Sequence, residues 1–122
     1  MKRVYVAGSF SSDNVLGVLD NMRIGMRKAT EVLLNGYSPF VPWFDYHFQL
    51  NLREGEKLSV QDYYNYSLDW LEVSDALLVL PGSDSSNGTK KEIERAKELG
   101  IPIYYSLNEL KSSKDIKGQG EE

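Results

Sequence analysis

The stretch Arg3-Val-Tyr-Val-Ala-Gly-Ser9 decides the fold, because a short β-branched and aromatic run that stops at a glycine predicts a buried first strand. Apolar residues then recur at helical spacing over residues 15–33, and Asn35-Gly36 is a typical helix end. Gly25 lies inside this helix, where glycine costs about 1 kcal/mol relative to alanine. We therefore expect another part of the chain to pack closely against Gly25.

The remaining chain continues the alternation of strands and helices. Strands are expected at residues 37–41, 75–81 and 101–105, and helices at residues 60–73, 89–99 and 107–116. Residues 42–59 form a long connection with no clear period. This order predicts an α/β fold with right-handed crossovers: a three-layer, flavodoxin- or Rossmann-like parallel sheet of about four to five strands, with helices on both faces. We expect one domain over residues 1–116 and a disordered tail at 117–122.

Composition excludes several classes of protein. The chain has 122 residues, which suits a single domain, and its net charge of −4 argues against binding a nucleic-acid polymer. It has no cysteine and only one histidine, His47, so we expect no metal and no cofactor. No stretch is apolar for long enough to span a membrane, and no signal peptide is visible, so we expect no membrane partner and a cytoplasmic location.

Topology alone predicts where a ligand binds. In an open parallel sheet, ligands bind beyond the carboxyl ends of the strands. The turn at Gly8, Ser9 and Phe10 follows the first strand and directly precedes a helix, so it can present backbone N–H groups to an anion. A glycine that only reverses the chain is the simpler reading of this turn. The absence of G-x-G-x-x-G spacing counts against a Rossmann dinucleotide site.

A second loop enters the same region before the helix expected at residues 89–99. Ser86, Asn87 and Gly88 are turn-forming residues, and Glu92 is expected in the first turn of that helix. The helix dipole would keep a carboxylate there ionised, as a nucleophile requires. A solvated surface glutamate among the charged residues 90–95 is the alternative interpretation.

The long connection carries an aromatic segment at residues 43–48. This segment, which begins at Trp43, could supply a flat face on which a nucleobase stacks, or it could be a lid or a dimer contact. His47 is interpreted as a hydrogen-bonding loop residue rather than a general base.

Three segments together resemble the nucleoside 2-deoxyribosyltransferase superfamily, which includes the 2'-deoxynucleoside 5'-phosphate N-hydrolases and uncharacterised phage and bacterial relatives. They are Tyr5-Val-Ala-Gly-Ser9, Ser67-Leu-Asp-Trp-Leu-Glu-Val-Ser-Asp75 and Ser86-Asn-Gly-Thr-Lys-Lys-Glu-Ile-Glu-Arg-Ala96. Their order and spacing match that superfamily from the first strand to the strand expected at residues 101–105.

The resemblance implies an N-glycosidase or a nucleoside deoxyribosyltransferase that acts on a (deoxy)nucleoside or nucleoside 5'-monophosphate, without a cofactor and as a homodimer or larger homo-oligomer. Glu92 matches the nucleophile of the family, and Tyr5 matches a tyrosine near the sugar. Such a carboxylate attacks the anomeric carbon, as in retaining glycosidases. The residues that match the surroundings of the phosphate or 5'-hydroxyl are Gly8, Ser9, Ser86 and Gly88.

The chain departs from the family at two positions. Active members carry an aspartate where this chain has Ser67, and a serine cannot act as an acid near neutral pH. Asp45 or Asp84 could replace that aspartate from the loops. The N-hydrolases also carry an arginine where this chain has Ser11, which counts against a phosphorylated substrate.

Two other functions stay open. The loss of the aspartate at Ser67 allows a non-catalytic nucleotide-binding module of the same fold. The order of Pro81, Gly82, Gly88, Thr89 and Glu92 also loosely resembles the loop of cytokinin-activating phosphoribohydrolases, although the extra residues between the two glycines count against that family.

Overall fold

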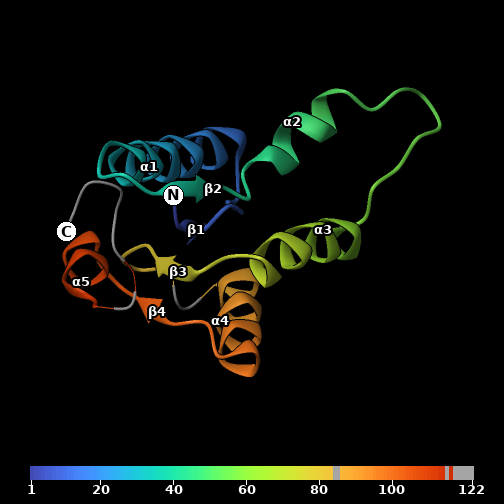
Figure 1. Ribbon diagram of the computed structural model, residues 1–122. Coiled ribbons are helices and arrows are strands. Elements are labelled where there is room, and N and C mark those ends of the chain that lie inside the picture. Colours follow the sequence, from blue (N-terminus) through green and yellow to red (C-terminus); the bar gives the residue numbers. More distant parts are fainter. Residues whose placement is uncertain (84–85, 115, 117–122) are drawn as a thin grey trace.

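A computed structural model describes residues 1–83, 86–114 and 116 of the chain. Within these residues the strands are β1 (Arg3–Ala7), β2 (Ser38–Phe40), β3 (Ala76–Val79) and β4 (Ile103–Tyr104). The helices are α1 (Val15–Leu34), α2 (Phe44–Leu50), α3 (Val60–Glu72), α4 (Asn87–Leu99) and α5 (Leu107–Ser112) (Figure 1). The tail expected at residues 117–122 lies outside the described residues, as does Asp84.

The strands form one parallel sheet in the order β2-β1-β3-β4, which confirms the predicted α/β class. Strand order reverses beside β1: the chain moves outward to β2, then returns to place β3 on the other side of β1. Pro39 lies in β2 at the edge of the sheet, where a missing N–H is tolerated. The carboxyl ends of β1 and β3 therefore meet at a switch in strand order, the usual ligand position in such sheets.

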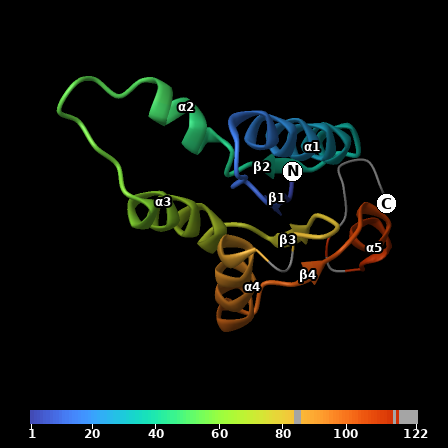
Figure 2. The same ribbon diagram turned by 180° about the vertical axis from the view of Figure 1, so that it is seen from behind.

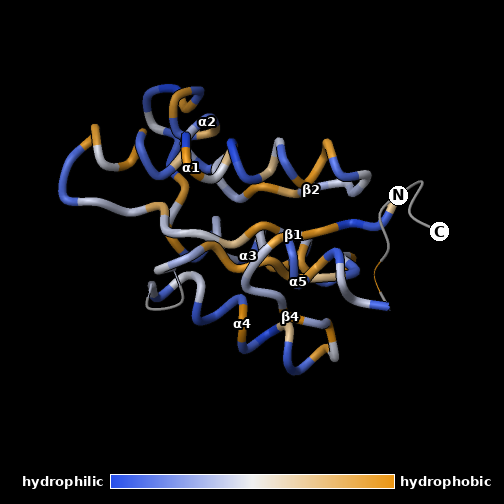
Figure 3. Tube along the Cα trace, turned by 90° about the vertical axis from the view of Figure 1, so that its left-hand side faces the viewer, coloured by the Kyte–Doolittle hydropathy of each residue, from blue (hydrophilic) through white to orange (hydrophobic). Residues whose placement is uncertain are grey.

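Side chains of the sheet alternate between two cores. On one face, Val4 and Val6 of β1 pack with Ala29 and Val32 of α1 and with Leu110 of α5. On the opposite face, residues of β1 and β3 pack with α3 and α4; these residues are Tyr5, Ala7, Leu71, Leu77, Val79 and Ala96. Figure 3 shows the hydrophobic β1 between flanking helices of mixed hydropathy. The three expected layers are thus present.

The indole of Trp43 explains why residue 25 is a glycine. A Cβ atom on Gly25 would lie 2.3 Å from Trp43 Cζ2, and a Cβ on Gly8 would lie 3.0 Å from the same atom. Trp43 itself is only 1% exposed. The expected close packing at Gly25 is confirmed, and its partner is the residue directly before α2.

Helix α2 was not expected, because residues 42–59 carry no helical period. None of its residues is buried, so its sequence lacks the apolar stripe that marks a helix packed on a core. It contacts α3 instead: Phe48 meets Tyr66 edge-on with ring centroids 5.3 Å apart, and the Tyr63 hydroxyl donates to Gln49. In Figures 1 and 2, α2 and α3 project on the same side of the sheet and residues 51–59 join them.

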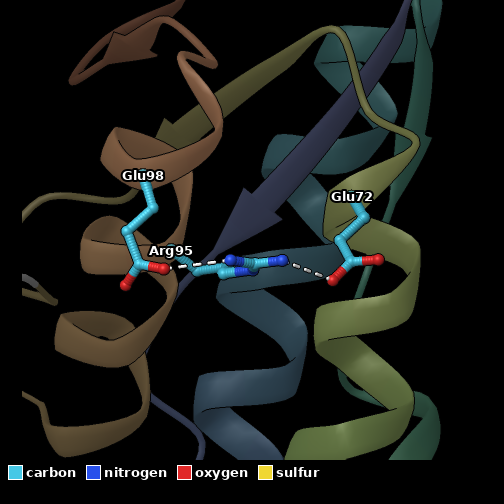
Figure 4. Close-up of polar contacts among 3 residues, drawn as sticks. All are labelled: Glu72, Arg95 and Glu98. Carbon is cyan, nitrogen blue, oxygen red and sulfur yellow. Dashed lines mark hydrogen bonds and ion pairs between the residues drawn. The ribbon is translucent and has the colours of Figure 1, made fainter.

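An ion-pair network joins α3 to α4 on the outer surface. The Arg95 guanidinium lies between the carboxylates of Glu72 and Glu98, at 2.9 Å from each (Figure 4). All three side chains are at least a third exposed, so the network adds little to the free energy of unfolding. The two helices are held mainly by the core between them and the sheet.

The Trp43 contact leads to a stability prediction. A Gly25→Ala substitution should lower the free energy of unfolding by about 1–3 kcal/mol because the new methyl group overlaps the indole, although alanine is the better helix former. Gly88→Ala is the matched control, since the nearest atom to its new Cβ is Tyr64 Cε1 at 3.5 Å, an ordinary contact. Urea unfolding of both variants would show this difference; an unchanged midpoint for Gly25→Ala contradicts the account.

Candidate active site

A cavity of about 710 Å³ lies beyond the carboxyl ends of β1 and β3. Its wall comes from the turn after β1, from α2, from α3 and from the start of α4. Most residues proposed from the sequence meet there. They are Gly8, Ser9, Phe10, Asp45, Ser67, Ser86, Asn87, Gly88 and Glu92.

Glu92 is a buried carboxyl group at this cavity, with an exposed fraction of only 8%. Helix α4 begins earlier than expected because the Ser86 side chain caps it, accepting a hydrogen bond from the Thr89 N–H at 3.2 Å. Glu92 therefore lies in the second turn, not the first. A surface position is also excluded, so the alternative interpretation of Glu92 was wrong.

Burial changes the charge expected on Glu92. Its pKa is raised from 4.5 to about 7. Desolvation by burial is the largest cause, the hydrogen bond from Tyr5 opposes it, and the negative charge of Asp45 adds to it. The expectation that the helix dipole keeps Glu92 fully ionised was wrong, because the dipole acts mainly within the first turn and desolvation outweighs it here. Near neutral pH the group exchanges a proton readily.

Tyr5 connects Glu92 to Ser67. The Tyr5 hydroxyl donates a hydrogen bond to Glu92 Oε2, and the ring is completely buried. Burial, the Glu92 charge and the hydrogen bond to Glu92 raise the pKa of Tyr5 well above its ordinary value, while a hydrogen bond with Ser67 lowers it. Three elements, β1, α3 and α4, thus supply one buried polar group each to a connected set.

Asp45 of α2 is a second carboxyl group at the cavity. Burial raises its pKa from 3.8 to about 6. Its Oδ1 atom is buried and has no hydrogen-bond partner among the described residues. The residue as a whole is half-buried and lines the cavity, whereas this oxygen has almost no accessible surface.

The turn after β1 and the start of α4 use several polar groups internally. The Ser9 N–H donates to Ser83 Oγ at 3.0 Å, and the Ser86 hydroxyl donates to Thr89 Oγ1 at 2.8 Å. Gly8 is required by packing, since a Cβ there would lie 2.7 Å from Leu80 Cδ1. Gly8 is not among the glycines with positive φ, so close packing, and not the reversal of the chain, accounts for its identity.

The structure does not bring Trp43 to the site. Its ring lies in the core against Gly25, and it is absent from the cavity wall, so it cannot stack on a ligand there. Exposed His47 does not line the cavity either. The aromatic side chains of the wall are Phe10 of the turn after β1, Tyr46 of the expected aromatic segment, and Tyr63 and Tyr64 of α3. Of these, Tyr63 and Tyr64 were not expected. The group of tyrosines at 63, 64 and 66 was the feature of the sequence that could have indicated an aromatic wall on α3.

Positive charge at the cavity comes from Lys91. Its ammonium lies 4.3 Å from the centroid of the Tyr64 ring, a cation–π contact. Among the described residues no group of three or more potential ligands could hold a metal ion. In the same part of the chain no helix is long and apolar enough to cross a membrane, and the cytoplasmic location stays a prediction.

An open parallel sheet with a cavity and buried polar groups at its switch point is the arrangement in which α/β proteins usually bind small ligands. Residues 2–106 match a family described as "Domain of unknown function (DUF7768)", and the chain belongs to that family. No curated protein matches the sequence.

Solved structures share the fold at low sequence identity. A conserved protein from Enterococcus faecalis V583 is 18% identical with a TM-score of 0.63, over 84% of this chain and 61% of that one. A 2-deoxyribosyltransferase from Bacillus psychrosaccharolyticus is 17% identical with a TM-score of 0.55, over 83% of this chain and 69% of that one. The chain thus spans about three fifths of the Enterococcus protein, and the likeness to both shows a 2-deoxyribosyltransferase-like fold.

The raised pKa of Glu92 predicts how stability depends on pH. The unfolded glutamate ionises near 4.5 and the folded one near 7, so stability is lost as pH rises through this interval and is level above it. A shift of this size corresponds to at most about 3 kcal/mol. Glu92→Gln should be more stable than the wild type at pH 8 and lose less stability between pH 5 and 8.

Denaturant unfolding at several pH values measures this difference. Glu94→Gln on the exposed side of α4 is the control and should follow the wild type. Parallel pH curves for the wild type and Glu92→Gln would show that burial of Glu92 does not disfavour its ionised form.

Proposed function

We propose that this protein cleaves or transfers the N-glycosidic bond of a nucleoside or nucleoside 5'-monophosphate, with Glu92 as the nucleophile. The observation that carries the proposal is a buried glutamate, hydrogen-bonded to Tyr5, on the wall of a cavity of about 710 Å³. Pockets of this size suit small ligands such as nucleosides. The deoxyribosyltransferase-like fold and the three sequence segments support the same reaction class.

In the proposed reaction Glu92 attacks C1' of the sugar. The C1'–N bond breaks, its electron pair leaves with the base, and a glycosyl ester forms on the Glu92 carboxylate. Water or a second base then attacks C1', and the ester bond breaks to restore the carboxylate. Hydrolysis and transfer differ only in this acceptor.

Tyr5 orients the nucleophile in this proposal. Its hydroxyl donates to one carboxylate oxygen and favours the ionised form of Glu92, so the other oxygen is available for attack. Because burial removes most of the water around Glu92, little solvent must be displaced from the carboxylate before it reacts.

The cavity wall divides into two regions that suit the two ends of a nucleoside. Gly8, Ser9 and the start of α4 at Gly88 offer small residues and a helix N-terminus for the 5'-hydroxyl or phosphate. The tyrosine wall, which includes Tyr63, offers flat faces for the base. We propose that Tyr46, Tyr63 and Tyr64 stack on the base, in place of Trp43.

The proposal includes a homodimer or larger homo-oligomer. The exposed side of α1 carries apolar side chains, which a second copy of the chain could cover. The most exposed are Val15 at 62%, Leu16 at 70% and Leu34 at 75%.

The reaction is tested by incubating the protein with (deoxy)nucleosides and their 5'-monophosphates and measuring free base by chromatography. Glu92→Gln should lower base release at least about a thousandfold, because removing a nucleophile abolishes the covalent route. Tyr5→Phe should lower it roughly 10- to 100-fold, the effect of losing a hydrogen bond to a charged group. Glu94→Gln is the matched control.

Absence of base release by the wild type, or equal release by Glu92→Gln, would contradict the proposal. If the wild type releases no base, a non-catalytic nucleotide-binding module is the remaining candidate, which the buried Ser67 in place of an aspartate favours. It would show thermal stabilisation by a nucleotide without turnover.

A further inference from the structure

A departing nucleobase needs a proton, and the residues proposed so far do not supply one. Glu92 is occupied as the nucleophile, and Tyr5 already donates its proton to Glu92. Ser67 occupies the position of the family's aspartate, and a hydroxyl is too weak an acid for this step. A general acid must therefore come from elsewhere on the cavity wall.

We propose that Asp45 of α2 is this group: it protonates the leaving base and then takes a proton from the incoming water or acceptor. The inference rests on the proposed glycosidic reaction and deepens it. Asp45 and Glu92 reach one cavity from different elements, α2 and α4, so a substrate can lie against both.

The position of Asp45 is built into the fold. Trp43, two residues earlier, is buried and packs against Gly8 and Gly25, so the position of the start of α2 is fixed by the core. Later in α2, Phe48 and Gln49 contact α3. The carboxyl group is thereby held at the cavity although α2 contributes no buried residue to either core.

The carboxyl group of Asp45 is partly removed from water where it meets the cavity. The residue lines the cavity, while its Oδ1 atom is buried and finds no hydrogen-bond partner in the described part of the chain. Burying a carboxylate oxygen without a partner disfavours the charged form, because the lost contacts with water are not replaced. The protonated form that a general acid requires is thereby favoured.

The surroundings of Asp45 favour its protonated form. The negative charge of Asp45 raises the pKa values of the acidic groups around it, which are Glu92 of α4, Tyr63 and Tyr66 of α3, and Tyr5 of β1. Burial raises the pKa of Asp45, and the lining cation Lys91 lies over the Tyr64 ring. An acid with a pKa near the working pH can both give and regain a proton.

Other acids in the described residues do not fit this role. Asp69, two residues after Ser67, is exposed on α3 and does not line the cavity. His47 of α2 is likewise exposed and outside the wall. Asp45 and Glu92 are the carboxyl groups that line the cavity among the described residues.

The proton balance is simple if Asp45 and Glu92 share one proton before reaction. The pKa of Glu92 is about 7 and that of Asp45 about 6, so the shared proton favours Glu92. The reactive form, in which Glu92 is ionised and Asp45 carries the proton, is therefore the minor form of the pair. Glu92 forms the bond to C1', the C1'–N pair moves to the base, and Asp45 transfers its proton to that base. In the second step the Asp45 carboxylate accepts a proton from water as the oxygen attacks C1' and the Glu92 ester bond breaks, so both groups return to their starting state.

Asp45→Asn tests the proposal because asparagine keeps the shape and removes the proton. For unmodified nucleosides that the wild type cleaves, the variant should lose activity about 10²- to 10⁴-fold. For an N7-methylated purine nucleoside, whose cationic base leaves neutral without protonation, the loss should be less than about fivefold. Asp69→Asn is the matched control and should retain activity on both.

A pH profile gives a second readout that needs only one cleaved substrate. The wild type should show a bell-shaped kcat/KM, because Glu92 must be ionised and Asp45 protonated. These limbs belong to the coupled pair rather than to either residue alone. Asp45→Asn should lose the limb at high pH and keep the limb at low pH.

The outcomes separate this inference from the proposed function. Equal losses on both substrates, no loss, or an unchanged bell in Asp45→Asn would overturn the role of Asp45 while leaving Glu92 as the nucleophile. Failure of the wild type to release any base overturns both. The thermal unfolding midpoint of Asp45→Asn should match or exceed that of the wild type at pH 8, which separates loss of chemistry from loss of fold.

Discussion

The indole of Trp43 fills the space that side chains at residues 8 and 25 would need, and much of the architecture depends on that contact. It joins the turn after β1, the middle of α1 and the residue before α2 in one packed unit. Because Gly8 and residues of α2 both line the cavity, the same contact holds these two parts of its wall next to each other. Trp43 thus positions part of the cavity wall from the core, without lining the cavity itself.

One residue of the site, the buried Glu92, destabilises the folded state when it is ionised. Glu92 is buried among apolar and polar groups with Tyr5 as its hydrogen-bond donor, and its pKa shows that ionisation is unfavourable there. Folding would be easier with a neutral residue at this position. Functional sites commonly keep such groups because the reaction uses the property that destabilises the protein.

The sequence predicted the parts of the structure that follow from periodicity. The β1 run, its glycine turn and the apolar repeat of α1 each specify a local structure, and alternation of these elements requires a parallel sheet. Helix α2 could not be predicted, because it is short and packs on α3 through scattered aromatic contacts. The position of Trp43 and the charge of Glu92 depend on contacts between segments far apart in the chain, which no local pattern contains.

One wall of the cavity is formed by segments that add nothing to either core. Helix α2 and residues 51–59 have no buried side chain in the described structure, whereas the wall that holds Glu92 is part of the sheet and its covering helices. Substitutions in the first wall should therefore change the free energy of unfolding very little. Substitutions in the second wall should change it more, because that wall belongs to the core. Related proteins could diverge in ligand preference by changing residues 51–59 and the α2 residues around Asp45, with Tyr5, Asp45 and Glu92 unchanged.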